Sequence, residues 1–298
     1  MSGIETLVYF DIEATGLKSS GKPRITEMSF VAVNSQSIID LHERITDYDG
    51  KMWKKDRTIL ESFTPRVMNK LTLCVYPMAT IMPNVTSITG LDNYNLTGQG
   101  RFDKNTGDLI KAFLDRLPSP VCLLAHNGNL YDFPLLKAEM EKVGVKLGLD
   151  ILCADSYVGM KEIIKKKEEK IRKEKAMNKK KFWLEKRKLV KTELRTKGIN
   201  DSKSTTKPGL NIVKKPSISE LLMQRKSFRL IPTSFSLINL HKYFLGRAPV
   251  QSHGAEADCL TLIRTTAALG MEWIDWVKRN NSLFKDFDQM WGSSWQEQ

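Results

Sequence analysis

The stretch LVYFDIEATGL, residues 7–17, decides the fold. Its apolar run over residues 7–14 is typical of a buried strand, and we expect further strands at residues 25–33, 37–45, 67–75, 121–126 and 149–155. Helical patterns cover residues 106–117 and 131–143, and also residues 234–246 and 255–270, which both end in glycine. Strands that alternate with helices predict an α/β protein with a mixed central sheet and helices packed on it.

Two acids end this first strand. Asp11 and Glu13 lie two positions apart, and on an extended chain such residues point to the same side. Two neighbouring carboxylates repel each other unless a proton or a cation lies between them. A hard divalent cation such as Mg²⁺ or Mn²⁺ prefers these oxygen ligands. Two solvent-exposed acids at a strand end are the alternative, so the pair needs partners elsewhere in the chain.

Further acids follow at two places. Asp132 comes after the apolar run of residues 121–126 and falls in the first turn of the next helix, where a negative side chain also suits the positive helix end. His253 and Asp258 are five residues apart and cannot share one helical face, so we expect His253 in a loop and Asp258 on the following helix. Glu256 competes with Asp258 as the acid that points inward.

The net charge of +13 belongs to one segment. Residues 161–215 hold 21 Lys or Arg and 7 Asp or Glu, whereas the other 243 residues have a net charge of −1. Residues 161–195 contain no Gly or Pro and predict a solvated helix, and residues 196–217 are typical of a loop. The segment could be a solvated insertion, an arm that contacts nucleic acid or a nuclear localisation signal.

The N-terminus and the cysteines restrict the location. The first residues lack the basic and apolar pattern of a signal peptide. No apolar run approaches the roughly 20 residues of a membrane helix. The four cysteines form no CxxC pair, which favours reduced thiols. We therefore expect a soluble intracellular protein without membrane contact.

Three motifs occur together in one order: FDIEATGL at residues 10–17, AHNGNLYDFPLL at residues 125–136 and HGAEADCLTL at residues 253–262. They resemble the acidic motifs of the DEDD exonucleases in the His-containing branch, and specifically the three-prime repair exonuclease family. Residues 87–91 and 153–156 are also similar to family segments. The resemblance implies the ribonuclease H-like, DnaQ-like exonuclease fold. We expect one exonuclease domain over residues 1–160 and 216–290, a basic insertion over residues 161–215 and a short tail over residues 291–298.

The resemblance also implies an activity. The family hydrolyses single-stranded or frayed DNA from the 3′ end in the 3′–5′ direction and releases nucleoside 5′-monophosphates with two Mg²⁺ ions, for which Mn²⁺ substitutes. By likeness, Asp11 would bridge both ions, Glu13 and Asp258 would hold the ion that carries the attacking water, and Asp132 would support the other. His253 would accept the proton of that water. The family likeness further implies a homodimer, a role in DNA repair or DNA catabolism, and residence in the nucleus or the cytoplasm.

Substrate-contacting residues follow from the same motifs. Those that the resemblance makes substrate-binding are Ala14, Thr15, Leu17, Ile88, Leu91, Asn127, Tyr131, Ser234 and His253. For Leu17 and Ile88, a place in the core is the alternative. Residues 48–66 carry only Pro65, so we expect no proline-mediated partner, and the chain ends without the apolar tail of one family branch.

Two other kinds of protein stay open. An RNA 3′ exonuclease or a polymerase proofreading-type exonuclease would use the same fold. A nucleic-acid-binding or scaffold protein without turnover is the alternative from another class, although such a protein has little need for four acids and a histidine.

Overall fold

The computed structural model describes residues 3–47, 64–196 and 231–291. Contacts divide the chain into a first unit, Met1–Ile163 with Thr233–Gln298, and a second unit, Ile164–Pro232. Three sequence predictions fall mainly outside the described residues. They are the loop at residues 196–217, the segment with a single proline at residues 48–66, and the C-terminal tail at residues 291–298.

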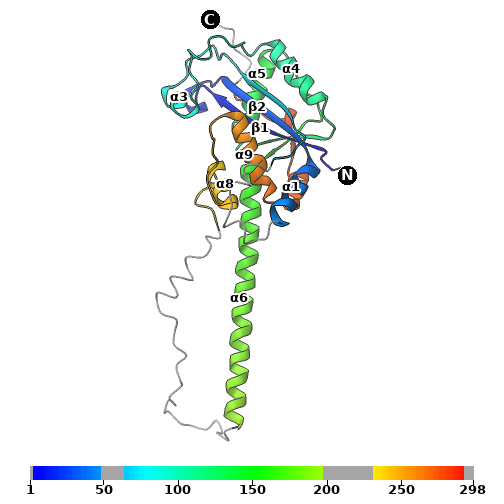
Figure 1. The fold of residues 1–298 in the computed structure, drawn as a ribbon, viewed down its shortest axis with the longest axis vertical. Coiled ribbons are helices and arrows are strands. Elements are labelled where there is room, and N and C mark those ends of the chain that lie inside the picture. Colours follow the sequence, from blue (N-terminus) through cyan, green and yellow to red (C-terminus); the bar gives the residue numbers. More distant parts are fainter. Residues whose placement is uncertain (1–2, 48–63, 197–230, 292–298) are drawn as a thin grey trace. The chain divides into compact units, whose positions relative to one another are not determined.

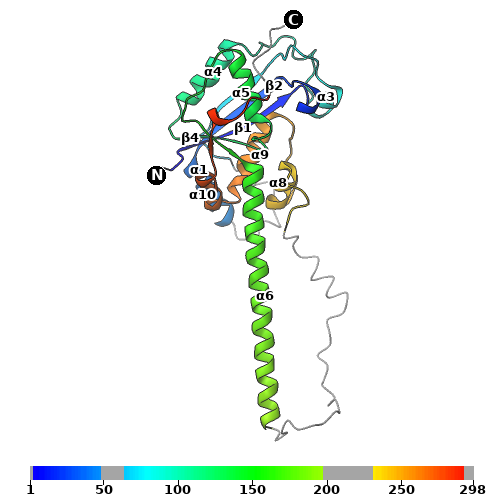
Figure 2. The same ribbon diagram turned by 180° about the vertical axis from the view of Figure 1, so that it is seen from behind.

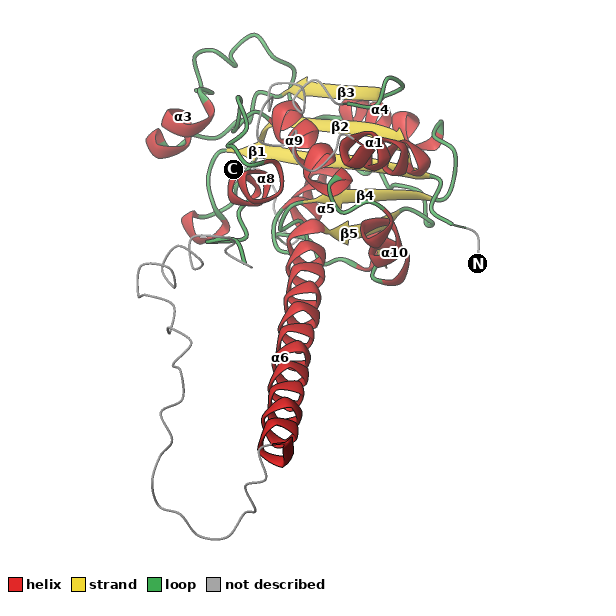
Figure 3. Cartoon of the chain, turned by 60° about the horizontal axis from the view of Figure 1, so that its bottom comes forward, coloured by secondary structure: helices red, strands yellow, loops and turns green. Residues whose placement is uncertain are grey.

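A mixed six-stranded sheet forms the centre of the first unit (Figure 3). Its strands are β1 (Thr6–Ala14), β2 (Ile25–Asn34), β3 (Asn69–Cys74), β4 (Val121–Ala125), β5 (Leu152–Asp155) and β6 (Ser282–Leu283). Their order is β3-β2-β1-β4-β5-β6, with β1, β4 and β5 parallel and the other neighbours antiparallel. The mixed sheet that the alternating pattern predicts is confirmed.

Helices cover both faces of this sheet. The helices of this unit include α1 (Ser35–Asp47), α3 (Pro83–Thr89), α4 (Lys104–Asp115), α5 (Asp132–Lys142), α8 (Leu237–Leu245), α9 (Ala255–Ala267) and α10 (Met271–Arg279). Of these, α3 has no buried residue and α8 contacts α9. Val8, Phe10 and Ile12 of β1 belong to the core that α4 and α5 complete. On the opposite face, the Tyr9 hydroxyl lies 2.8 Å from Thr266 Oγ1 of α9, next to α1 (Figure 1). The period-2 alternation of β1 therefore directs Asp11 and Glu13 to the α9 side.

The strand that we expect at residues 37–45 is wrong, because this segment lies within α1. Its large apolar residues Ile38 and Leu41 are both buried, and they are three positions apart. Asp40, Glu43 and Arg44 are exposed on the remaining surface. A three-residue spacing places Ile38 and Leu41 on one helical face, whereas on a strand they would point to opposite sides.

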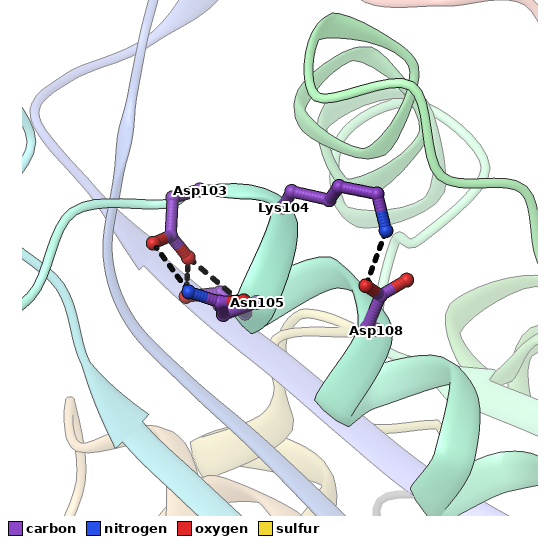
Figure 4. Close-up of polar contacts among 5 residues, drawn as sticks. Asp103, Lys104, Asn105 and Asp108 are labelled. Carbon is purple, nitrogen blue, oxygen red and sulfur yellow. Dashed lines mark hydrogen bonds and ion pairs between the residues drawn. The ribbon is translucent and has the colours of Figure 1, made fainter.

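The start of α4 shows how local chemistry sets a helix boundary (Figure 4). Asp103 is its N-cap, and the Asp103 carboxylate accepts a hydrogen bond of 2.8 Å from the Thr106 backbone N–H. An exposed ion pair of 2.5 Å joins Lys104 and Asp108 one turn apart. Because the cap supplies the acceptor that the first turn lacks, the helix starts two residues before the apolar pattern predicts.

Of the basic segment, residues 161–196 lie in the long helix α6 (Ser156–Thr196), drawn in green in Figure 2, which begins directly after β5. The helix that we expect over residues 161–195 is confirmed. Gly159 in its second turn faces Trp273 and Trp276 of α10, where an added Cβ would lie 2.6 Å from both rings. Within the described segments, no helix has the length and apolar character needed to cross a membrane.

Candidate active site

Three carboxylates from two elements come together at the end of β1. Asp11 and Glu13 extend from the strand and Asp258 from the first turn of α9, and one oxygen of each lies within 4.8 Å of the others. All three side chains are partly buried. The strand alternation and the placement of Asp258 on a helix, both expected from the sequence, are therefore confirmed.

Asp132 approaches the same place from α5. It is the first residue of that helix, it is 5% exposed, and its Oδ1 accepts a hydrogen bond of 3.2 Å from the Ile12 backbone N–H. This bond attaches the start of α5 to the segment of β1 between Asp11 and Glu13. The expected position of Asp132 in the first helical turn is confirmed.

The acids interact electrostatically. Burial, and then the charges of Asp132, Asp258, Glu13 and Glu27, raise the pKa of Asp11 well above its ordinary value. Burial and neighbouring carboxylates also raise the pKa of Glu13 to about 7, and burial raises that of Asp132 to about 7. Such a set of crowded oxygen donors fits a hard divalent cation, because a bound cation would offset the repulsion between the ionised carboxylates.

Glu27 is a fifth acid that the sequence reasoning missed. It faces Glu13 across the β1–β2 pair, and its Oε2 accepts a 2.7 Å hydrogen bond from the Ala255 backbone N–H in the first turn of α9. Glu27 thus holds the helix that carries Asp258. No motif spacing signals this role, because it depends on which strand pairs with β1.

His253 and Glu256 lie at the start of α9 and have different partners. His253 precedes the helix in a loop, is exposed and has φ 65°, and its backbone N–H donates to Asp258 Oδ2 at 3.0 Å. Burial raises the pKa of Asp258, and the backbone hydrogen bond and the charge of His253 offset part of this shift. Glu256 instead pairs with Lys70 at 2.7 Å. Asp258, and not Glu256, is therefore the acid of the cluster.

The segment after β1 presents apolar surface. Leu17 is 64% exposed and Ile88 is 54% exposed, so neither is a core residue, and Leu91 is partly buried. Ala14 and Thr15 are buried. Thr15 is held by the backbone of Arg24, whose N–H donates to Thr15 Oγ1 at 3.0 Å.

A buried ion pair supports this segment. The Arg24 guanidinium donates to both carboxylate oxygens of Glu139 on α5, at 2.6 and 2.9 Å. The Tyr131 hydroxyl, just before α5, donates to the Gly16 carbonyl at 2.5 Å. The Tyr131 bond joins the start of α5 to the segment after β1, and the Arg24 pair joins the residue before β2 to a later turn of α5.

Asp155 holds the loop between β4 and α5. This buried carboxylate accepts hydrogen bonds from the backbone N–H groups of Asn127, Asn129 and Tyr157 at 2.9–3.2 Å. The side chain of Asn127 is exposed, and its φ is 67°. The loop that carries Asn127 and leads to Asp132 is therefore fixed from the end of β5.

His126 joins this loop to the segment that holds Ser234. Its Nε2 lies 2.9 Å from the Phe235 carbonyl, and its Nδ1 lies 2.9 Å from Ser156 Oγ. Because a carbonyl only accepts, Nε2 carries the proton and Nδ1 accepts from the hydroxyl. Burial lowers the pKa of His126, which favours this neutral form. Ser234 is exposed, and its Oγ accepts from Asn239 at 2.7 Å.

No protein-family model matches the chain. Among solved structures, exonuclease I, in a structure described as suggesting how its processivity is achieved, covers 91% of this chain and 43% of its own, with a TM-score of 0.53 and 14% identity. E. coli exonuclease I in complex with a dA16 oligonucleotide covers 91% and 42%, with a TM-score of 0.50 and 13% identity. The chain therefore has the ribonuclease H-like fold of exonuclease I.

In sequence, the chain resembles the three-prime repair exonucleases. It is 39% identical over 163 residues to three-prime repair exonuclease 1 of Bos taurus, covering 54% of this chain and 48% of that protein. It is 37% identical over 159 residues to three prime repair exonuclease 2 of Homo sapiens, covering 53% and 61%. The chain thus matches about half the length of the first of these relatives, and the resemblance expected from the three motifs is confirmed.

Proposed function

We propose that the protein is a metal-dependent 3′–5′ DNA exonuclease that degrades single-stranded or frayed DNA and releases nucleoside 5′-monophosphates. The observation that carries the proposal is the convergence of Asp11, Glu13 and Asp258 beside Asp132. The fold of exonuclease I and the likeness to three-prime repair exonucleases support phosphodiester hydrolysis at this cluster.

We assign the metal site to these four acids, with two Mg²⁺ ions as the physiological cofactor and Mn²⁺ as a substitute. Such ions would stabilise negative charge on the phosphate and make water a stronger nucleophile. Burial and the neighbouring carboxylates raise the pKa values of Asp11 and Glu13, and this supports the assignment, because a bound cation would stabilise the ionised carboxylates. All donors are oxygens, as hard cations prefer.

We assign the general base to His253. Its place in an exposed loop beside Asp258 leaves the imidazole accessible to water and substrate. Histidine is the side chain that most often serves as a general base in catalysis. Asp258 would stabilise the imidazolium that results, since its charge lies nearby.

We assign the 3′-terminal nucleotide to the surface formed after β1 and before α5. Leu17 and Ile88 offer exposed apolar contacts that suit any base, and Leu91 adds to them. We also assign Ala14 and Thr15, which directly follow Glu13, to this nucleotide-binding surface. Asn127, Tyr131 and Ser234 would contact sugar and phosphate.

The experiment is degradation of a 5′-labelled single-stranded DNA oligonucleotide by purified protein. We expect a ladder of shortened products and free monophosphates with Mg²⁺, and none with a chelator. Asp11→Asn should abolish the reaction, whereas the isosteric control Asp108→Asn on exposed α4 should retain it. Undiminished hydrolysis by Asp11→Asn would contradict the proposal.

A matched RNA oligonucleotide separates the nearest alternative. The 2′-hydroxyl distinguishes the two substrates, so equal rates on DNA and RNA would argue for a general or RNA exonuclease. A protein without turnover would bind the strand in a metal-dependent manner and release no product.

Three further assignments rest on the sequence likeness. We propose a homodimer, for which β3 is a candidate because it lies at an edge of the sheet with every second residue exposed. We also propose a role in DNA repair or catabolism and residence in the nucleus or cytoplasm. Sedimentation of the purified chain would detect the dimer.

A further inference from the structure

The distal part of α6 carries aromatic side chains on its surface. Phe182 is 58% exposed and Trp183 is 51% exposed. Their ring centroids are 5.8 Å apart in an edge-to-face arrangement, and Lys186 Nζ lies 5.5 Å from the centre of the Trp183 ring. We name Phe182, Trp183 and Lys186 the aromatic patch. An exposed aromatic pair on a solvated helix has no role in the core of the first unit.

Among the side chains of α6 that the structure describes, the surroundings of the patch are mostly basic, and the exposed apolar neighbours are Met177 and Leu184. The positions three and four residues from Trp183 on either side hold only cations: Lys179, Lys180, Lys186 and Arg187. Phe182 and Trp183 are adjacent in sequence and are therefore about 100° apart around the axis. A coiled-coil seam or a membrane-surface helix needs apolar residues repeated along one face. This helix instead has two aromatic side chains next to several Lys and Arg.

The charge of α6 selects the kind of partner. The helix contains 16 Lys or Arg and 6 Asp or Glu. Phosphates complement this excess, and aromatic rings among cations are the elements with which proteins hold single strands, because every base has a face that stacks. Lys186 supports this use, since an ammonium over one face of an indole adds a cation beside a stacking surface.

We propose that α6 carries a binding site for single-stranded nucleic acid, in which bases stack on Phe182 and Trp183 while the adjacent Lys and Arg contact phosphates. This site needs no 3′ end and therefore goes beyond the proposed exonuclease activity. It would hold the body of a strand irrespective of sequence.

The test uses the full chain in the presence of chelator and a fluorescent circular oligothymidylate, which has no 3′ end. We expect the double variant Phe182→Ala/Trp183→Ala to raise the Kd at least about 10-fold, since stacking contributes on this scale per base. The slope of affinity against salt should stay unchanged in this variant. Met177→Ala, which removes an exposed apolar but non-aromatic side chain from the same helix, should bind as the unaltered protein does.

Two further probes separate stacking from charge. A circular strand of the same length without bases should bind the unaltered protein weakly, and the double variant should bind it equally weakly. Lys179→Gln/Lys180→Gln should weaken binding of both circles and flatten the salt dependence. Helix content measured by circular dichroism should not fall in the alanine variants, because alanine favours helix.

Three results would overturn the proposal. The first is an equal Kd of the double variant and the unaltered protein for oligothymidylate. The second is equal binding of strands with and without bases. The third is binding of anionic lipid vesicles, but not of the strand, that depends on Phe182 and Trp183. Hydrolysis of a short linear strand is a separate readout, so loss of nuclease activity and loss of this site are distinguishable.

Discussion

Glu27 shows that one residue outside the acidic motifs sets the geometry of the cluster. Its carboxylate accepts the Ala255 N–H and so connects β2 to the helix that bears Asp258. Because its own charge also raises the pKa values of Asp11 and Glu13, its benefit lies in positioning and not in relieving repulsion.

We expect Glu27→Ala to raise the Mg²⁺ concentration needed for half-maximal activity and to lower kcat/KM by about 10–100-fold, as the loss of groups that orient metal ligands does. Glu27→Gln should recover most of the loss, because an amide oxygen can still accept from Ala255. Glu5→Ala, which removes an exposed acid bonded to Asn34, is the control. An unaltered Mg²⁺ dependence in Glu27→Ala would refute a positioning role.

Asp258 and Glu256 are a second residue-scale comparison. Asp258→Asn should abolish hydrolysis, because an amide is a poorer ligand for a hard cation than a carboxylate. Glu256→Gln should leave kcat unchanged, since this side chain pairs with Lys70 outside the cluster. The check is single-turnover cleavage of one oligonucleotide by both variants. Similar losses of cleavage rate in the two variants would contradict a specific role of the Asp258 carboxylate.

At the scale of elements, the loop between β4 and α5 depends on one carboxylate. Asp155→Ala would leave the backbone N–H groups of Asn127, Asn129 and Tyr157 without their acceptor. We expect the free energy of unfolding to fall by about 1–3 kcal/mol and KM to rise more than kcat falls. Asp155→Asn, which keeps an acceptor oxygen, should show smaller changes. Denaturant unfolding and steady-state kinetics measure both effects.

The sequence predicts elements well where one periodicity dominates. The alternation of β1 correctly directs Asp11 and Glu13 to one side, and the five-residue spacing correctly separates His253 in its loop from Asp258 on α9. The prediction at α1 is wrong because the buried Ile38 and Leu41, three positions apart, fit one helical face and not the alternation of a strand, and α1 contacts α9. Glu27 and Asp155 could not be predicted, since their roles arise from strand pairing between distant segments.

At the scale of the whole molecule, we expect the acids to make stability depend on pH and, through the proposed metal site, on divalent cations. The pKa of Glu13 is raised from its ordinary 4.5 to about 7, so the folded protein holds this proton more tightly than the unfolded chain does. Its contribution to stability is therefore full below pH 4.5 and is lost as the pH rises through about 7.

We expect the thermal midpoint in chelator to fall as the pH rises from about 5 to about 8, and Mg²⁺ to restore it more at the higher pH, where the carboxylates are ionised. Glu13→Gln should have a flatter pH dependence and a smaller response to Mg²⁺. Differential scanning calorimetry at several pH values, with and without Mg²⁺, makes the comparison. A Mg²⁺ response that is larger at low pH would contradict the assignment of the site.

The direct passage from β5 into α6 has a consequence for how this molecule tolerates change in length. Asp155 ends the strand, and the helix starts at the next residue, with its second turn packed on Trp273 and Trp276. Because the first turns of α6 are already packed on α10, the helix can be lengthened at its C-terminal end without additional core contacts or a new loop after β5. Residues 161–196 of the basic segment are therefore an extension of the helix that follows β5, and we expect changes in their length and composition to leave the acids in place.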